Sequence, residues 1–371
     1  MLYSSFSSNP RFTKHLVSEG VFKNNPLTVV DVGARGGPEY HWVNYGDAVR
    51  FIGFEPDKGE CERLNRDLGS GSATRFYPAA LYSDKGTHTF YEQVSSAAGG
   101  LCPRDPKIVN RFPTGELFKI TGTSQIKTTT FDSFAEDYKI PEVDFIKTDA
   151  EGADFDVVKG SVSQIKKSVL GISSEIHFAP WCGEGKGFSE LEQLLRPLGF
   201  KLYDINFCRF ANKAFPSIDS VLPGGCGVSS YGQIIFAQAI FFRDPVAEIE
   251  DKKLLSSDWD ATRVLKAASL FEVFGLPDCA IELLGVAEKY RIINDSEKIN
   301  IEKFRDLITS GFLGRTITYR QHLQKLLDIK KRGYFNNYER FKPYFKKVPY
   351  LAKIRSFVKK QIAQRHNNYS S

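Results

Sequence analysis

The sequence lacks long apolar runs, paired cysteines and the Gly-x-Gly-x-x-Gly loop of nicotinamide-binding domains. No uninterrupted apolar stretch in the 371 residues approaches the roughly 18 residues that a membrane-spanning helix needs. The N-terminal residues contain no continuous apolar core behind a basic start, so we expect no secretory signal. The cysteines stand far apart, at Cys61, Cys102, Cys182, Cys208, Cys226 and Cys279. We therefore expect reduced thiols, and neither a thiolate metal site nor a disulfide scaffold.

The positive net charge of the chain is concentrated at its end. Apolar residues make up 42% and charged residues 25%, which is typical of a folded protein and excludes wholesale disorder. The net charge of +6 is uneven, because residues 330–371 contain 12 Lys or Arg against the single acid Glu339, whereas the preceding residues are mildly acidic. Such a basic segment favours an anionic partner, and a membrane surface and nucleic acid are the two usual candidates.

Apolar strand-like runs alternate with helical patterns between residues 28 and 243. This alternation predicts an α/β domain whose parallel sheet is connected by crossover helices. We expect strands at 27–32, 49–55, 74–82, 143–149, 169–176, 200–205 and 233–242, and helices at 57–68, 130–138, 152–167 and 188–197. Near-continuous apolar runs are typical of strands that helices cover on both faces.

Three further segments flank this α/β domain. Residues 1–27 are expected to form an N-terminal helical segment, and residues 244–329 a helical appendage. The tail at 330–371 contains an apolar stripe from Tyr350 to Ile362 with Lys and Arg largely beside it, which is the pattern of a basic amphipathic helix.

A glycine-rich stretch, Asp31-Val-Gly-Ala-Arg-Gly-Gly37, follows the first predicted strand. Glycine at a strand-to-helix turn lets the backbone approach a ligand closely, although such a loop is often just a tight turn. Glu55 ends the second predicted strand, where a carboxylate can accept both hydroxyls of a ribose. Together the two features favour a nucleoside-type cofactor. Because Arg35 replaces the second glycine of the nicotinamide fingerprint and Asp31 places an acid beside the turn, the positively charged S-adenosylmethionine suits this loop better than a pyrophosphate does.

The sequence resembles the FkbM-type family of class I S-adenosylmethionine-dependent methyltransferases over about residues 28–242. The most distinctive segment is Lys147-Thr-Asp-Ala-Glu-Gly152, and it is supported by Asp31 to Gly37, Phe54-Glu-Pro-Asp57, Ala79-Ala-Leu81, Ser83-Asp84, Thr130-Phe-Asp-Ser133 and Ser174-Glu-Ile-His177. The resemblance implies a Rossmann-like, seven-stranded and mostly parallel sheet that ends in a reversed hairpin. It also implies O-methyl transfer, often onto sugars or natural products.

The same resemblance places the cofactor. Its methionine end would lie at the loop after the first strand, its ribose at the end of the second, and its adenine next to the following loop. The residues carried over are Asp31, Gly33, Ala34, Arg35, Gly37, Glu55, Pro56, Asp57, Ser83, Asp84 and Asp149. Arg35 stands where the family often has a small polar residue.

Methyl transfer to a hydroxyl needs a nearby base, and two sets of polar residues follow predicted strands. Lys147, Asp149 and Glu151 follow the fourth, and Glu175 and His177 follow the fifth. We expect Asp149, Glu151, Glu175 and His177 to form one polar cluster with a base among them, and Lys147 to have either a direct role there or that of a counter-ion to Asp149. The less favoured alternative for Asp149 is that it only caps the helix that starts near Gly152. The alternative for Lys147, Glu175 and His177 is a structural ion-pair network. Whether the carboxylates also bind a divalent cation is left open by the sequence.

Function, partners and location follow from these patterns as expectations. The preferred function is O-methylation of a glycan or related small molecule, with RNA methylation and a non-catalytic cofactor-binding scaffold as alternatives. Residues 334–365 are expected to meet an anionic membrane surface, with nucleic acid the less favoured partner. This predicts a cytoplasmic protein that lies peripherally on the inner face of the membrane. No motif indicates the oligomeric state.

Overall fold

The computed structural model describes residues 6–68, 73–182, 187–218, 228–251, 259–294 and 299–331. The chain divides into two compact units, residues 1–315 and residues 316–371. The amphipathic helix that the sequence predicts within 334–365 lies outside the described residues, as does Cys226.

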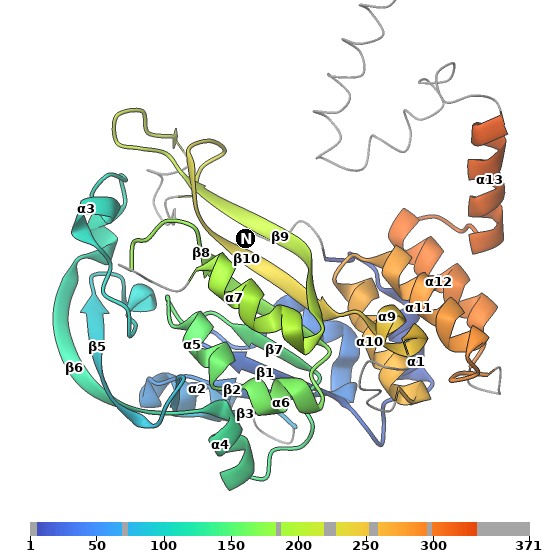
Figure 1. Cartoon of the computed structure of the whole chain (residues 1–371), viewed down its shortest axis with the longest axis horizontal. Coiled ribbons are helices and arrows are strands. Elements are labelled where there is room, and N and C mark those ends of the chain that lie inside the picture. The colour runs from blue at the N-terminus through green and yellow to red at the C-terminus, as the bar shows by residue number, and fades with distance from the viewer. Residues whose placement is uncertain are drawn as a thin grey trace, which may run out of the picture. The chain divides into compact units, whose positions relative to one another are not determined.

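Seven strands form the main sheet of the larger unit, in the order β3-β2-β1-β7-β8-β10-β9. The first five pair in parallel, and β10 runs antiparallel to both β8 and β9. The strands are β1 (Leu27–Val32), β2 (Val49–Phe54), β3 (Arg75–Tyr77), β7 (Phe145–Thr148), β8 (Gly171–His177), β9 (Phe200–Phe210) and β10 (Gln233–Arg243). This order, with its reversed last hairpin, confirms the Rossmann-like sheet of a class I methyltransferase (Figure 1).

Four helices cover one face of the sheet. They are α4 (Phe131–Asp137), α5 (Asp154–Lys159), α6 (Val162–Lys167) and α7 (Phe188–Leu195), and they share a core with apolar side chains of the strands. The sequence predicted one helix over 152–167, but the structure has two. They are separated near Gly160, where an added Cβ would lie 2.1 Å from the backbone oxygen of Tyr82.

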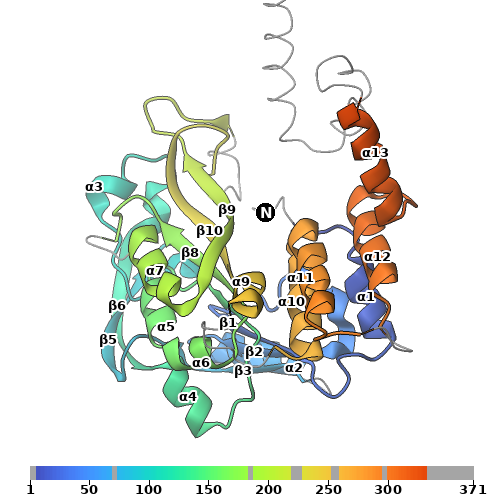
Figure 2. The ribbon, with the colours of Figure 1, turned by 45° about the vertical axis from the view of Figure 1, so that its right-hand side comes forward.

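The opposite face is covered by helices from both ends of the chain. They are α1 (Arg11–Ser18), α2 (Lys58–Leu68), α10 (Ala261–Val273), α11 (Pro277–Lys289) and α12 (Ile301–Leu313), with the short α9 (Pro245–Glu250) leading into them. Figure 2 shows α1, α10, α11 and α12 packed side by side. One apolar cluster joins this helical region to the sheet, so residues 244–315 share a core with the α/β domain that precedes them.

A buried ion pair fixes α10 to the sheet. The Lys266 Nζ lies 2.8 Å from the Asp144 Oδ2, which also accepts a hydrogen bond from the backbone N–H of Thr28. Asp144 therefore ties the start of β1, the start of β7 and α10 together.

A second, three-stranded sheet is inserted between β3 and β7, in the order β4-β6-β5. It comprises β4 (Ala80–Leu81), β5 (Gly86–Gln93) and β6 (Ile120–Thr129), and the short helix α3 (Pro106–Val109) lies in the β5–β6 connection. The single strand predicted over 74–82 is thus wrong, because β3 and β4 belong to different sheets. β6 escaped prediction because its side chains are mostly exposed and polar.

The smaller unit contains α13 (Tyr319–Lys331). The Thr318 hydroxyl accepts a hydrogen bond from the backbone N–H of Gln321 at the start of this helix. Leu323, Leu326 and Leu327 are exposed on it. Within the described ranges, we find no helix with the length and apolar character required to cross a membrane.

Replacing Lys266 by Met should lower the free energy of unfolding by about 3–5 kcal/mol, because the Asp144 carboxylate would stay buried without its cation. Lys201→Met is the matched control. Its ion pair with Asp244 is largely exposed on the lysine side, so its loss should cost at most about 1 kcal/mol. Urea unfolding of both variants measures the difference, and equal costs would show that the Lys266 pair does not anchor α10.

Candidate active site

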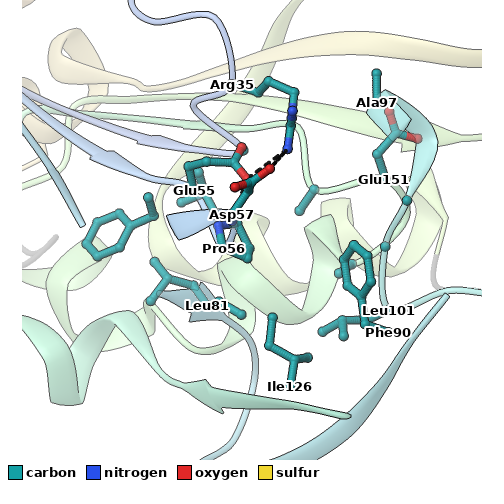
Figure 3. A pocket seen from close by; sticks show the side chains of 18 of the residues that line it. Arg35, Glu55, Pro56, Asp57, Leu81, Phe90, Ala97, Leu101, Ile126 and Glu151 are labelled. Atoms are coloured by element: carbon teal, nitrogen blue, oxygen red, sulfur yellow. Dashed lines mark hydrogen bonds and ion pairs between the residues drawn. The ribbon is translucent and has the colours of Figure 1, made fainter. Parts of the chain in front are cut away.

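A cavity of about 800 Å³ lies at the carboxyl ends of β1, β2 and β7 and extends beneath the second sheet. This is the edge at which ligands bind in open α/β sheets, and the volume is within the range of small-molecule sites. Figure 3 shows Glu55 and Asp57 on one side of the cavity and Glu151 on the other, with Leu81, Phe90 and Ile126 along the wall.

An ion pair crosses the floor of the site between the two central strands. Asp31 on β1 and Lys147 on β7 are register partners, and the Lys147 Nζ lies 3.1 Å from the Asp31 Oδ1 and 3.5 Å from the Asp149 Oδ2. Burial raises the pKa of Asp31 to about 6, against the opposing effect of Lys147. Burial alone would lower the pKa of Lys147, but Asp31 and Asp149 outweigh it and raise that pKa. Lys147 therefore has the counter-ion role that the sequence left as one alternative.

Gly33 makes the turn after β1 possible. Its φ is +80°, and a Cβ there would lie 2.0 Å from the backbone oxygen of Asp149. The N–H groups of Gly33 and Ala34 both donate to the Phe54 carbonyl oxygen. The ends of β1, β2 and β7 are thereby drawn together at one residue that cannot carry a side chain. Gly37 also has a positive φ but packs toward Leu68, and it does not line the cavity.

Glu55 lies buried where β2 ends, as the sequence predicted. Its Oε1 accepts a hydrogen bond from the backbone N–H of Asp57, and burial raises its pKa. Arg35 reaches across the entrance, with its Nη2 3.5 Å from the Glu55 Oε1 and 3.0 Å from the Asp57 Oδ2 (Figure 3). Pro56 lines the cavity beside them. Since Arg35 is partly exposed, a ligand diol can replace it on Glu55 with little disturbance of the fold.

The two residues expected to border the adenine lie outside the lining of the cavity. Ser83 and Asp84 do not line the cavity, and Asp84 lies 3.2 Å from the Nε2 of His88 instead. Ala79, Ala80 and Leu81 line it, as does Gln93 from the end of β5. Both polar atoms of the Gln93 amide are buried and have no hydrogen-bond partner in the described part of the chain. An orphaned amide in a cavity wall indicates that a polar ligand completes the site.

The structure brings together the four acid and histidine residues that the sequence grouped. Asp149 and Glu151 follow β7, and the Glu175 Oε1 on β8 lies 2.6 Å from the His177 Nε2. Burial, together with the charge of Glu175, raises the pKa of Glu151 to about 8. Burial and the charge of Asp149 raise the pKa of Glu175, while burial and Arg104 lower the pKa of His177 to about 4. Of the four, Asp149 and Glu151 line the cavity, and the Glu175–His177 pair does not.

Asp154, the first residue of α5, fixes the loop that precedes the helix, and no side chain, that of Asp149 included, caps α5. Its two carboxylate oxygens accept hydrogen bonds from the backbone N–H groups of Ala150 and Gly152. Glu151 sits between them with a φ of +52°, a conformation that is uncommon for a residue with a side chain and is often found at functional sites. Asp149 is thus left facing the cavity.

Arg104 is a site residue that sequence reasoning missed. It comes from the connection between β5 and β6, its side chain is almost fully buried, and its Nη2 lies 2.5 Å from the Glu151 Oε2. Its guanidinium also lies 4.9 Å from the ring centroid of Trp181. An isolated arginine in a connecting segment offers no pattern to recognise, because its partner lies 47 residues away in the sequence.

The expectation that all six cysteines are separate thiols is wrong for one pair. Cys102 and Cys182 are joined as a disulfide beside Arg104, with their Cα atoms 5.6 Å apart. Their sequence separation of 80 residues hid this proximity. Cys61, Cys208 and Cys279 are free thiols.

The aromatic residues considered as acceptor contacts lie mostly in the core. His41, Trp42 and Tyr45 are buried in the cluster beneath the sheet, and the Tyr45 hydroxyl lies 3.0 Å from that of Ser269. Trp181 is also buried, but its ring lies edge-on to His177 and under Arg104. Trp181 therefore supports the acidic cluster from behind.

Metal binding receives no support in the described ranges. No group of three or more His, Cys, Asp or Glu residues is arranged there to hold an ion. The donor set fits an organic ligand better. A buried carboxylate suits a diol, the apolar wall suits a flat base, and the excess of acids suits a positive charge.

The family model of the methyltransferase FkbM domain matches residues 31–202. The chain is similar to a methyltransferase FkbM structure from Methylobacillus flagellatus, with 14% identity over 58% of this chain and 43% of that chain, and a TM-score of 0.31. It is also similar to a TehB-like SAM-dependent methyltransferase from Corynebacterium glutamicum, with 10% identity over 62% of this chain and 87% of that chain, and a TM-score of 0.29. A third similar structure is magnesium protoporphyrin IX methyltransferase from Synechocystis, solved with bound SAM. Its identity is 9% over 63% of this chain and 79% of that chain, and the TM-score is 0.29. No curated protein sequence matches this chain.

Proposed function

We propose that this chain O-methylates a hydroxyl of a glycan or a related small molecule, with S-adenosylmethionine as the methyl donor, because residues 31–202 match the family model of the methyltransferase FkbM domain. The observation that carries the proposal is the buried acidic cluster of Asp149, Glu151 and Glu175, in which Glu151 lines the cavity. Carboxyl groups there outnumber the cations Arg104 and Lys147, which disfavours an anionic acceptor and suits a neutral hydroxyl.

The residues present can hold the cofactor. S-adenosylmethionine supplies a methyl group that is activated by attachment to a positively charged sulfur. Glu55 would bind the ribose diol after Arg35 moves aside, and the apolar wall at Leu81 would border the adenine. Asp31, which Lys147 holds in place, and the backbone at Gly33 would shape the methionine end.

We assign the role of base to Glu151. It lines the cavity, and its pKa of about 8 lies near the operating range, where a carboxylate is most effective as a general base. It would withdraw the proton of the acceptor hydroxyl as the new C–O bond forms. Arg104 orients the Glu151 carboxylate, and the Glu175–His177 pair forms the wall behind it.

S-adenosylmethionine should bind the wild type with micromolar affinity, and Glu55→Ala should weaken binding about 10- to 100-fold, because two hydrogen bonds from the ribose to a charged group are lost. Isothermal titration calorimetry measures this. Glu62→Ala is the control, since Glu62 is exposed on α2 and pairs with Lys58 away from the cavity. Absence of binding to the wild type would favour a scaffold role over methyl transfer.

With a methylatable glycoside as acceptor, kcat/KM should rise about tenfold per pH unit up to about pH 8 and level off above it, because Glu151 must lose its proton to act as the base. Glu151→Gln should lower kcat about 10²- to 10⁴-fold and abolish this rise. The readout is transfer of a labelled methyl group from S-adenosylmethionine across a pH series.

Two further measurements in the same assay make the result decisive. Glu92→Gln removes another acid that lines the cavity and should keep the pH dependence unchanged. Neutral glycosides should outperform uronic acids and sugar phosphates, because the acidic cluster repels anions. If RNA is methylated and none of the glycosides is, the proposed glycan acceptor is wrong and RNA is the substrate.

We also propose that the C-terminal residues bring this activity to an anionic membrane surface, on the cytoplasmic side. The support is a charge of +11 over residues 330–371 together with the exposed leucines of α13. Each cation near an anionic surface contributes about 1 kcal/mol, and the leucines add apolar area. A glycan carried on a lipid in that surface would then be the acceptor.

Sedimentation with vesicles tests the membrane proposal. The full chain should bind vesicles containing phosphatidylserine and not pure phosphatidylcholine vesicles, and binding should weaken as salt rises. Deletion of residues 334–371 should abolish it, and Leu323→Ser combined with Leu327→Ser should weaken it. Undiminished binding of the deletion variant would contradict the proposal, and retention on RNA without retention on vesicles would identify nucleic acid as the partner.

A further inference from the structure

The cavity does not suit all three charged groups of S-adenosylmethionine equally. The sulfonium and ammonium groups suit its acidic lining, which among the described residues contains Glu55, Asp57, Glu92, Asp149 and Glu151. The carboxylate does not, because burying an anion beside several acids is unfavourable unless a cation pairs with it. Binding of this cofactor therefore requires a partner for its carboxylate, supplied either by backbone N–H groups or by a cationic side chain.

The backbone of the loop after β1 has few free donors for that carboxylate. The N–H groups of Gly33, Ala34 and Gly37 donate to backbone carbonyl oxygens, and that of Gly36 donates to a side-chain carboxylate on α2. No α-helix follows the loop directly in this described stretch, since η1 (Tyr40–Ala48) is a 3₁₀ helix. The α-helical N-terminus that often binds an anion is therefore missing at this turn.

Two cationic side chains line the cavity among the described residues, Lys147 and Arg35. Lys147 is buried, and its Nζ already pairs with Asp31 and Asp149. Moving Lys147 to a ligand would leave the buried Asp31 without its cation, which is strongly unfavourable. Arg35 is the cation that remains, and its side chain is 41% exposed at the entrance of the cavity.

Arg35 can change partners at little cost. Its Nη2 lies 3.5 Å from the Glu55 Oε1 and 3.0 Å from the Asp57 Oδ2 (Figure 3). A ribose diol would offer Glu55 two hydroxyl donors in place of this guanidinium. Asp57 is about half exposed, so water can replace Arg35 there. The planar guanidinium is then free to bind another carboxylate through two parallel hydrogen bonds.

We propose that Arg35 leaves Glu55 and Asp57 when the cofactor enters and binds the carboxylate of its methionine group. This inference rests on the proposed function, because the ligand concerned is the methyl donor. Arg35 belongs to the same loop as Gly33, which lines the methionine end of the cavity. The exchange makes the site selective for adenosine ligands that carry an amino acid, because a ligand without the carboxylate leaves Arg35 competing for Glu55.

Isothermal titration calorimetry of the full chain with two ligands tests this selectivity. They are S-adenosylmethionine and decarboxylated S-adenosylmethionine, which keeps the adenosine, the sulfonium and the ammonium. If the carboxylate had no partner, the acidic lining would favour the decarboxylated ligand. We expect the opposite order in the wild type, with S-adenosylmethionine bound about 10- to 100-fold more tightly, because its carboxylate gains charged hydrogen bonds.

Substitution of Arg35 should reverse this order. Arg35→Gln should weaken binding of S-adenosylmethionine about 10- to 100-fold and strengthen binding of the decarboxylated ligand, because Glu55 loses a competing cation. Arg35→Lys should have a smaller effect, since it keeps the charge and loses the paired donors. Arg196→Gln is the matched control, because Arg196 pairs with Glu192 on the surface and does not line the cavity. It should keep the wild-type order.

The outcomes separate this inference from the proposed function. If the wild type binds the decarboxylated ligand as tightly as S-adenosylmethionine, or more tightly, the role of Arg35 is refuted and the methyl-donor site stands. This comparison needs no variant, so it decides even where a variant fails to fold. If Arg35→Gln strengthens binding of both ligands, Arg35 only competes for Glu55 and the inference is wrong. If the wild type binds neither ligand, the proposed cofactor is wrong and the inference is refuted with it.

Discussion

The cross-strand ion pair between Asp31 and Lys147 is the interaction on which the rest of the site depends. Both side chains are buried at adjacent positions of β1 and β7, and neither charge could stay there alone. Lys147 also reaches Asp149, so the pair holds the first carboxylate of the acidic cluster. Gly33 places the turn after β1 against the backbone of that same residue. The glycine turn after β1 and the acidic cluster after β7 are therefore built on one pair of strands.

The inserted second sheet turns this strand edge into an enclosed site. Without it, the ends of β1, β2 and β7 would face solvent, as in a bare α/β sheet. Phe90 and Ile126 from the insertion line the cavity, Gln93 places its amide there, and Arg104 crosses to Glu151. Burial then changes the chemistry of the acids, raising the pKa of Glu151 into the range where a carboxyl group can exchange a proton near neutral pH.

The helices at the two ends of the chain serve stability more directly than chemistry. α10 is buried along most of its length, and Lys266 anchors it at Asp144, far from the cavity. The backbone N–H of Thr13 in α1 donates to Glu272 of α10, which attaches the N-terminal helix to the same layer. The change in sequence pattern at residue 244 marks the point where strands are followed by helices. It is not a boundary in the packing, because residues 1–315 form one compact unit with a shared apolar cluster.

Local pattern and spacing were enough to predict the alternation of strands and helices along the main sheet, the glycine turn after β1, Glu55 at the end of β2 and the grouping of Asp149, Glu151, Glu175 and His177. These features depend on residues close together in the sequence, or on the rule that parallel strands end at one edge. Contacts between distant segments were decided by the tertiary structure. Arg104 meets Glu151, and Cys102 meets Cys182, because the insertion folds back over the main sheet. The sequence contains no signal for such contacts, since their geometry exists only once both sheets have packed.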